Sequence, residues 1–405
     1  MNEMTTGDAP NVKIARRAAD RLRDGHVWVY RSDLADAEQM LPFGGLVHVL
    51  SEKGRFLGSA LASSASQIAL RMISIHAISE GEMLSELLRQ RVRNAIAYRR
   101  RFAADSDAYR LVFSDADGLP GLIVDRYADV LTMQALTQAM DRADLRAVVI
   151  ETLQSELGIE NIVERADTQS KMREREQLPA IESRQICGDK SETVFRMNGL
   201  AFAFDALGGQ KTGAFLDQRQ NYAAAEKYAR GRALDICTYQ GGFALHLARV
   251  CAAVAAVDVS RAALEVADQN ARRNQPQLRC EIEWLQANAF DALRDWSDSG
   301  EKYDTIVLDP PAFAKTRRKS EEALKGYKEL NLRALKMLAS GGVLVTCSCS
   351  HHVAEADFLL MLLAAANDAK RRLRILERRT QAVDHPVLLG VPETQYLKCI
   401  IALVE

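Results

Sequence analysis

The spacing of apolar positions changes near residue 190 of this 405-residue chain. After that point, short apolar runs alternate with amphipathic stretches, which is the pattern of a parallel sheet with crossover helices. We expect buried strands at residues 233–237, 252–259, 306–308, 343–346 and 396–403, and helices at residues 244–249, 262–274 and 324–338. The pattern predicts a doubly wound, Rossmann-like α/β domain over residues 191–405.

The preceding residues show two other patterns. Short β-like runs separated by glycines predict a small β-rich domain over residues 1–75. A helix-patterned segment at residues 83–102 follows, and hairpin-like runs then flank the turn sequence DGLP at residues 117–120. These runs predict an α+β central domain over residues 76–190.

Composition places the chain among ordinary globular proteins, with 48% hydrophobic and 26% charged residues. No run of about 18 apolar residues occurs, so we expect no membrane-spanning helix and no membrane partner. Residues 1–13 are polar and lack the apolar stretch of a secretory signal. We therefore expect a cytoplasmic protein.

The formal net charge of -1 gives no global signature of nucleic-acid binding, so any RNA contact must come from local basic clusters. Three clusters occur: Arg89, Arg91, Arg93, Arg99, Arg100 and Arg101; Lys315, Arg317, Arg318 and Lys319; and Lys370, Arg371, Arg372 and Arg374. A solvated helix face is the ordinary explanation for such a cluster, and only the second directly follows a catalytic motif. The charged residues 171–177 are expected to form an exposed loop.

The seven cysteines lie between residues 187 and 399, and none forms a C-x-x-C pair. Neither a zinc site nor a thioredoxin-type motif is therefore indicated, and we expect no metal. In a reducing compartment these side chains should be free thiols.

A glycine turn follows the first strand of the α/β domain, in the sequence LDICTYQGGFA at residues 234–244. Glycines at such a turn let the backbone approach a nucleotide-like ligand. The spacing is not G-x-G-x-x-G, which argues against a dinucleotide and hence against an NAD-dependent oxidoreductase. Asp258 ends the next strand, where its carboxylate can accept hydrogen bonds from both ribose hydroxyls. These features favour an adenosine-containing cofactor. Asn288 is placed to meet the adenine edge, although an ordinary turn asparagine explains it equally well.

The sequence DTIVLDPPAF at residues 304–313 is more specific. Asp309 follows a buried strand and precedes two prolines, which fix the backbone and remove its N–H donors. In open α/β sheets the carboxyl ends of strands face the ligand crevice. Asp309 can therefore hydrogen-bond a flat base beside a methyl donor.

The next buried strand ends in the sequence VLVTCSCS at residues 343–350. Cytosine C5 is a poor nucleophile, but a thiolate added to C6 makes C5 reactive. That chemistry needs a cysteine at the carboxyl end of a strand and an acid near N3 of the base. We assign Cys349 as the nucleophile and Cys347 as a buried packing residue, whereas a purely structural role for both is the alternative.

Together these residues resemble the large-subunit ribosomal RNA cytosine-C5 methyltransferase family that carries an amino-terminal PUA domain. The segments that carry the resemblance are residues 115–127 (DADGLPGLIVDRY), residues 209–219 (GQKTGAFLDQR), Gly241 and Gly242, the Asp309 motif, Cys349, and residues 384–387 (DHPV). The resemblance implies a PUA-like domain, a central domain and a class I methyltransferase domain that uses S-adenosylmethionine.

The resemblance also implies cofactor contacts in the segment before the first sheet strand, from Gln210, Thr212, Phe215, Gln218 and Arg219. Further expected cofactor contacts are Asp235, Tyr239, Gly241, Gly242, Asp258, Asn288 and Asp309. Asn288 stands where the family usually has an acidic residue, and Val27 where it commonly has proline. No second cysteine accompanies the Asp309 motif, so one thiol must act alone or with a base that the sequence does not identify.

The expected activity is methyl transfer to a flipped-out cytidine in large-subunit ribosomal RNA, with the PUA-like domain and the arginine-rich helix holding the RNA backbone. A cation such as Lys315 is expected to lower the thiol pKa. One alternative is methylation of an exocyclic amine of guanine or adenine, which needs no cysteine. Another is a non-catalytic RNA-binding assembly factor. The sequence does not fix the target nucleotide or the oligomeric state, although the apolar central domain could support a homodimer.

Overall fold

The computed structural model describes residues 9–36, 38–103, 106–166, 171–208, 214–313 and 320–405. The chain divides into two compact units. The first comprises Met1–Phe195, Phe204–Gly213 and Val383–Thr394, and the second comprises Arg196–Ala203, Ala214–Ala382 and Gln395–Glu405. This division does not separate the two domains expected in the first 190 residues, so the predicted boundaries stay predictions.

The first unit begins with a small five-stranded sheet in the order β1-β3-β4-β5-β2. Its elements are β1 (Asn11–Ile14), α1 (Arg16–Arg23), β2 (Trp28–Tyr30), the 3-10 turn η1 (Arg31–Asp33), β3 (Leu46–Ser51), β4 (Phe56–Ala62) and β5 (Ile68–Ser74). Val12, Ile14, Val47 and Val49 project from neighbouring strands into one buried cluster. The small β-rich domain predicted from the sequence is confirmed.

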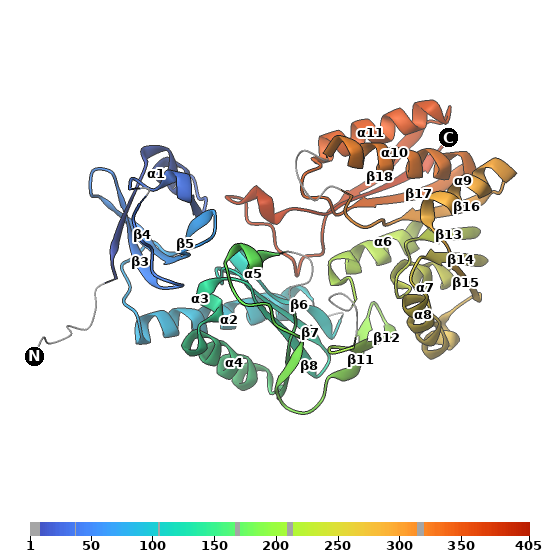
Figure 1. The fold of residues 1–405 in the computed structure, drawn as a ribbon. Helices are drawn as coiled ribbons and strands as arrows, with labels where there is room; N and C mark the ends of the chain where they lie inside the picture. Colours follow the sequence, from blue (N-terminus) through green and yellow to red (C-terminus); the bar gives the residue numbers. More distant parts are fainter. Residues whose placement is uncertain (1–8, 37, 104–105, 167–170, 209–213, 314–319) are drawn as a thin grey trace, which may run out of the picture. The chain divides into compact units, whose positions relative to one another are not determined.

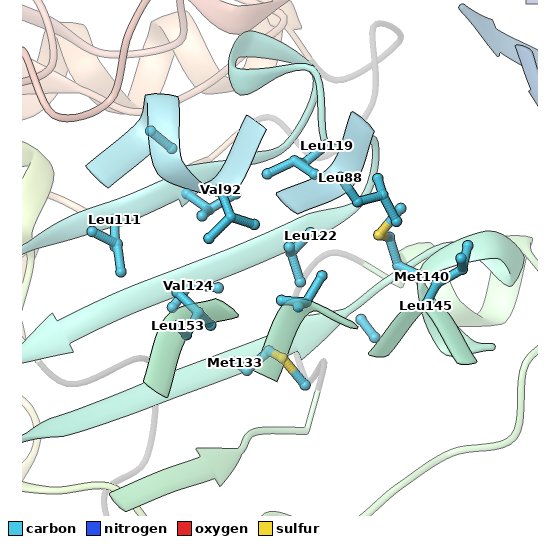
Figure 2. Packing of buried hydrophobic residues seen from close by; sticks show 14 of the residues in the cluster. Leu88, Val92, Leu111, Leu119, Leu122, Val124, Met133, Met140, Leu145 and Leu153 are labelled. Atoms are coloured by element: carbon cyan, nitrogen blue, oxygen red, sulfur yellow. The ribbon is translucent and has the colours of Figure 1, made fainter. Parts of the chain in front are cut away.

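A second five-stranded sheet follows in the order β10-β9-β8-β7-β6. Its elements are α2 (Glu82–Phe102), β6 (Ala108–Phe113), η2 (Ser114–Asp117), β7 (Leu122–Tyr127), β8 (Val130–Ala135), α3 (Gln138–Asp141), α4 (Ala143–Leu157), β9 (Asn161–Glu164), α5 (Met172–Arg175) and β10 (Arg184–Cys187). Leu88 and Val92 lie one turn apart on α2, which places both on the face that packs against Leu122 and Val124 of β7 (Figure 2). Burying each such side chain contributes about 1.5–3 kcal/mol.

The arginine-rich helix α2 was expected to hold the RNA backbone, but two of its arginines form hydrogen bonds with other groups of the protein. Arg99 is fully buried, and its guanidinium lies 2.5 Å from a carboxylate oxygen of Asp117 and donates to the carbonyl oxygen of Asp384 at 2.8 Å. Arg91 donates to the carbonyl oxygens of Ile73 and Gly118. The prediction that the arginines of this cluster hold RNA is therefore wrong for Arg91 and Arg99. Arg100 and Arg101 are exposed, so the prediction stays open for them.

The charged residues 171–177 also differ from expectation, since they do not form a wholly exposed loop. They include the short helix α5, and Glu176 after it is fully buried. Its carboxylate lies 2.9 Å from the guanidinium of Arg71 and accepts a hydrogen bond of 2.6 Å from Ser63. A charged side chain can be buried when a partner of opposite charge is buried with it, and no local pattern reveals such a partner.

The second unit contains a seven-stranded sheet in the order β15-β14-β13-β16-β17-β19-β18. The strands are β13 (Arg232–Ile236), β14 (Ala253–Asp258), β15 (Ile282–Gln286), β16 (Tyr303–Leu308), β17 (Leu338–Ser348), β18 (Leu373–Arg379) and β19 (Lys398–Val404), and the hairpin β11 (Glu192–Met197) and β12 (Leu200–Asp205) precedes them. The first five pair in parallel, while β19 is antiparallel to both β17 and β18. Strand order reverses between β13 and β16, and ligands bind outside the carboxyl ends of strands at such a switch point.

Helices cover both faces of this sheet (Figure 1). They are α6 (Arg219–Tyr228), α7 (Gly242–Ala248), α8 (Arg261–Asn274), α9 (Ala289–Ser299), α10 (Ser320–Met337) and α11 (Glu355–Asp368), with the 3-10 turns η3 (Leu216–Gln218), η4 (Gln275–Gln277) and, in the first unit, η6 (Pro392–Thr394). The buried side chains of β16 and β17 pack with those of α10 and α11 in one core. The predicted doubly wound α/β fold is confirmed. In the described part of the chain, no helix is both long and apolar enough to cross a membrane.

Candidate functional site

The loop after β13 folds back tightly onto the start of α7. Cys237 and Tyr239 have positive φ angles of 65° and 52°, and Gly241 has 86°. Such a backbone costs about 1–3 kcal/mol at a non-glycine residue, so the surrounding structure must hold it. A Cβ atom on Gly241 would lie 2.5 Å from Leu245, and one on Gly242 would lie 2.5 Å from the ring of Tyr222. Close packing against the ring of Tyr222 therefore favours glycine at position 242, and the positive φ favours it at position 241.

Asp235 supports this loop from inside the sheet. Its side chain is fully buried and accepts a hydrogen bond of 2.6 Å from the hydroxyl of Thr238. Burial raises the pKa of Asp235 to about 7, although the Thr238 hydrogen bond opposes the shift. The structure thus places this predicted cofactor residue beneath the loop, where it fixes the loop conformation.

Asp258, the last residue of β14, joins the loops that follow two neighbouring strands. One carboxylate oxygen accepts from the backbone N–H of Tyr239 at 2.9 Å, and the other accepts from the N–H of Ser260 at 2.8 Å. Each oxygen has a second lone pair, so the carboxylate can accept further hydrogen bonds from a bound molecule.

The segment before β13 reaches the same place. The ring of Phe215 meets the ring of Tyr239 edge to face, with centroids 5.1 Å apart. Gln218 is buried, and its amide donates to a carboxylate oxygen of Asp309 at 2.9 Å. Arg219, the first residue of α6, is fully buried. The predicted contacts Gln210 and Thr212 lie outside the described residues.

A cavity lies between these groups. Its lining includes Phe215, Thr238, Tyr239, Gln240, Gly242 and Asp309. Aromatic rings, a glycine backbone and a carboxylate suit a ligand that combines a flat base, a sugar and a charged group. Four of the predicted cofactor residues, Phe215, Tyr239, Gly242 and Asp309, therefore meet around one cavity.

Asn288 has a structural role that the sequence left open. It is exposed and caps α9, where its side-chain oxygen accepts from the N–H groups of Phe290 and Asp291 at 2.9 and 3.4 Å. An asparagine at this position is a preferred helix cap whether or not it meets a ligand. The described lining of the cavity does not include it.

Asp309 begins the loop that leaves β16 at the switch point. Its N–H donates to the carbonyl oxygen of Ile236 at the end of β13, at 3.2 Å. The following Pro310 and Pro311 offer no N–H donors. The carboxylate is thereby held at the carboxyl edge of the sheet, next to the cavity.

Cys347 of β17 and Cys349, which follows that strand, lie in different environments. Cys347 is fully buried within the strand, opposite Cys399 of β19. Cys349 comes just after the strand and is partly exposed, and its Sγ lies 3.9 Å from the carbonyl oxygen of Pro310. The thiol of Cys349 and the carboxylate of Asp309 thus share one edge of the sheet.

The electrostatics of Cys349 correct one expectation. Burial, together with the carboxylates of Asp309 and Asp217, raises the pKa of its thiol to about 12, and Lys398 opposes the shift. The pKa of the thiol is therefore raised and not lowered, although one cation, Lys398, acts in the expected direction. Lys315, named for that purpose, lies outside the described residues.

Sequence reasoning missed the groups that come from the last strand. Lys398 of β19 is buried, and its ammonium donates to the carbonyl oxygens of Ser350 and Tyr396 at 2.7 and 2.9 Å. The hydroxyl of Tyr396 donates to a carboxylate oxygen of Asp217 at 2.7 Å. The available signal was a lysine inside the otherwise apolar run KCIIALV.

Among the residues that the structure describes, no group of three or more His, Cys, Asp or Glu side chains is arranged to hold a metal ion. The seven cysteines are all free thiols.

Comparisons with known proteins agree with this arrangement. A PUA-like domain matches residues 12–75, and the S-adenosylmethionine-dependent methyltransferase family matches residues 166–397. Ribosomal RNA large subunit methyltransferase I of Shewanella denitrificans is 34% identical over 403 residues, which cover 98% of this chain and 100% of that protein. The protein of the same name from Salmonella schwarzengrund is 32% identical over 404 residues, 98% of each chain.

The fold also matches a solved structure. The crystal structure of SMU.776 in complex with SAH (S-adenosylhomocysteine) superposes with a TM-score of 0.82 at 18% identity, and covers 97% of this chain and 100% of that one. Because the family match spans more than half of the chain, and relatives above 30% identity span nearly all of it, the chain belongs to the S-adenosylmethionine-dependent methyltransferases, uses S-adenosylmethionine, and carries a PUA-like domain ahead of its catalytic sheet.

Proposed function

We propose that this chain methylates C5 of a cytosine in large-subunit ribosomal RNA, through a covalent bond between Cys349 and C6 of the base. The observation that carries the proposal is the position of Cys349 beside the Asp309 motif, with its Sγ 3.9 Å from the Pro310 carbonyl oxygen. The names of the relatives support the polymer and the ribosomal subunit.

The proposed cofactor site consists of residues that contact the cofactor and residues that support them. S-adenosylmethionine, when bound, supplies an electrophilic methyl group. We propose that Phe215, Gln218, Tyr239 and Gly242 hold it in the cavity, and that Asp258 accepts hydrogen bonds from its ribose. Arg219, Asp235 and Gly241 would keep that pocket in shape, while Gln210, Thr212 and Asn288 stay predicted contacts.

The target base needs a nucleophile and an acid on neighbouring strands. The Cys349 thiolate adds to C6, and the electrons of the C5–C6 double bond become available at C5. Asp309 hydrogen-bonds N3 and supports its protonation. C5 takes the methyl group, a base removes the C5 proton, and the C6–sulfur bond breaks to restore the ring and the thiolate.

The high thiol pKa fits activation by the substrate itself. In the free protein the Asp309 carboxylate raises the pKa of Cys349. When Asp309 shares a proton with N3 of the base, its negative charge is reduced, so the same thiol loses its proton more easily. The fraction of Cys349 present as thiolate would therefore rise when a cytosine is in place.

The polymer must present its base unstacked, because C5 and C6 are inaccessible in a stacked helix. The PUA-like domain is the natural candidate for holding the RNA backbone, together with exposed basic residues. We propose that the enzyme acts in the cytoplasm, as a monomer or as a homodimer.

The test is nucleoside mass spectrometry of unmodified ribosomal RNA incubated with the protein and S-adenosylmethionine carrying a labelled methyl group. The expected product is labelled 5-methylcytidine, and Cys349→Ala should abolish it. Label on guanosine or adenosine that survives Cys349→Ala would mean amine methylation instead. If no nucleoside is labelled and the cofactor does not bind in a titration, the chain acts as an RNA-binding assembly factor.

A further inference from the structure

Lys398 is a buried charge that the proposed mechanism has not used. It occupies the first position of β19, in register with Ser348 at the end of β17. Its ammonium donates to two backbone carbonyl oxygens, those of Ser350 and Tyr396. Among the described residues no carboxylate forms an ion pair with it. A buried ammonium without a counter-ion is costly, and the other residues of this strand are almost all apolar.

The titratable groups around Cys349 come from six elements. Asp309 after β16 and Asp217 in η3 raise the pKa of the thiol, while Lys398 lowers it. Glu355 of α11 and Cys349 itself favour the charged form of Lys398. Tyr327 of α10 and His351 after β17 also titrate here, with pKa values shifted up and down respectively, in each case first by burial. Lys398 is the one cation in this described set that opposes the two carboxylates.

We infer that Lys398 is a positioning residue whose charge stabilises the Cys349 thiolate. The inference rests on the proposed function, in which Cys349 is the nucleophile. On ionisation the S–H bond breaks, the electron pair stays on sulfur, and the proton leaves to solvent. The thiolate so formed is the missing negative partner of the ammonium. A lysine therefore stands in an apolar strand because the reactive form of Cys349 needs it, and not because the fold does.

The test is the alkylation rate of Cys349 by N-ethylmaleimide, a neutral reagent, in the full-length protein without RNA or cofactor. Tandem mass spectrometry separates Cys349 from Cys347. We expect Lys398→Met to slow alkylation of Cys349 about tenfold at pH 7, which corresponds to a rise of about one pKa unit. Lys398→Arg should keep most of the rate.

The pH dependence separates charge from packing. Burial lowers the pKa of Lys398 to about 8, so its charge is present below that pH and is lost above it. The difference between wild type and Lys398→Met should therefore shrink as the pH rises well above 8. Lys302→Met is the matched control. Lys302 is exposed, also donates to a backbone carbonyl oxygen, and directly precedes the first residue of β16, so this variant should not change the alkylation rate of Cys349.

Lys398→Gln provides a second neutral variant, since its amide can still donate to a backbone carbonyl if Lys398→Met does not fold. Equal alkylation rates for wild type and the neutral variants would overturn the inference. So would an equal slowing by Lys398→Arg, because packing and not charge would then be responsible. Failure of the proposed function would appear separately, as label on a nucleoside other than cytidine.

Discussion

Cys347 and Cys349, at the end of β17, show how a small difference in position changes the exposure of a thiol. Cys347 and Cys349 lie close together in sequence, but the first is inside β17 and fully buried, and the second follows the strand and is partly exposed. Residues two positions apart point to the same face of a strand, so the difference comes from the end of β17 at Ser348, which lies between the two cysteines. Only Cys349 can meet a base at the carboxyl edge of the sheet.

Replacing each of the two cysteines should separate the two roles. Cys349→Ala should lower methyl transfer at least a thousandfold while the affinity for S-adenosylmethionine stays unchanged, because the residue serves only the target base. Cys347→Ala should keep activity and lower the free energy of unfolding by about 1 kcal/mol, since it removes one buried sulfur. Methyl-transfer assays, cofactor titration and denaturant unfolding measure the three quantities. Loss of activity in Cys347→Ala alone would reverse the assignment.

Replacing Asp258 should weaken binding of S-adenosylmethionine, whereas replacing Asp304, which also accepts from a backbone N–H, should not. Asp258→Ala removes the acceptor for the N–H groups of Tyr239 and Ser260 and the proposed acceptor for the ribose. We expect the Kd for S-adenosylmethionine to rise about 10- to 100-fold, equivalent to about 1.4–2.7 kcal/mol. Asp304→Ala is the control, because Asp304 also accepts from a backbone N–H, that of Arg232, but at the amino end of the sheet. Calorimetric titration should show no change for the control, and equal weakening by both variants would contradict the ribose assignment.

Among the elements, the strands of the catalytic sheet could be predicted because parallel strands are buried on both faces and read as apolar runs. The positions of Asp258, Asp309 and Cys349 followed from the ends of those runs. The edge strand β18 was not predicted, because its sequence LRILERR is rich in charged residues. Charged residues are common on edge strands, where one side meets solvent.

Pairings between distant segments could not be predicted in the same way. The contact of Gln218 with Asp309 joins residues 91 positions apart, and that of Tyr396 with Asp217 joins residues 179 positions apart. Burial is the main cause of the raised pKa of Cys349, and distant segments modify it: Asp217 in η3 raises the pKa, and Lys398 in β19 lowers it. A sequence shows which residues can react, whereas the charges around them depend on tertiary structure.

Helix α7 contains a buried histidine that should make stability depend on pH. His246 is fully buried, one ring nitrogen lies 2.7 Å from the carbonyl oxygen of Gly242, and the other lies 3.0 Å from the amide nitrogen of Asn198. The neutral ring satisfies both contacts, whereas a protonated ring would face the Asn198 donor with a second donor. Burial lowers the pKa of His246 from 6.5 to about 4.

The sign of the pH effect follows from that shift. The folded state binds the proton less readily than the unfolded state, so the contribution to stability is complete above pH 6.5 and is lost as the pH falls toward 4. The loss amounts to about 3 kcal/mol. Denaturant unfolding at pH 7.5 and pH 4.5 should show it in wild type, and His246→Gln should have a smaller pH dependence. An unchanged pH dependence in the variant would rule out this role of His246.

At the scale of the whole molecule, the near-zero net charge means that the proposed RNA binding would depend on local groups of exposed basic residues. Helix α2 contains both buried and exposed arginines: Arg99 is buried against Asp117, and Arg101 is exposed. The two residues therefore allow structural and RNA-binding roles to be separated.

Arg99→Met should lower the free energy of unfolding by about 3–5 kcal/mol, because it leaves the Asp117 carboxylate without its buried partner. Arg101→Met should leave stability unchanged, weaken RNA binding a few-fold, and reduce the slope of log affinity against log salt by about one. Filter binding at several salt concentrations and thermal unfolding measure these effects. If Arg101→Met leaves both RNA affinity and the salt slope unchanged, α2 has no part in holding RNA.

The most direct measurement of the central proposal is capture of the covalent intermediate on RNA that contains 5-fluorocytidine. Fluorine at C5 cannot leave as the proton does, so the bond between the enzyme and C6 should persist after methyl transfer. The account predicts a protein–RNA adduct that requires S-adenosylmethionine and maps to Cys349 by peptide mass spectrometry. No adduct, together with transfer of labelled methyl to an exocyclic amine of ordinary RNA, would contradict it.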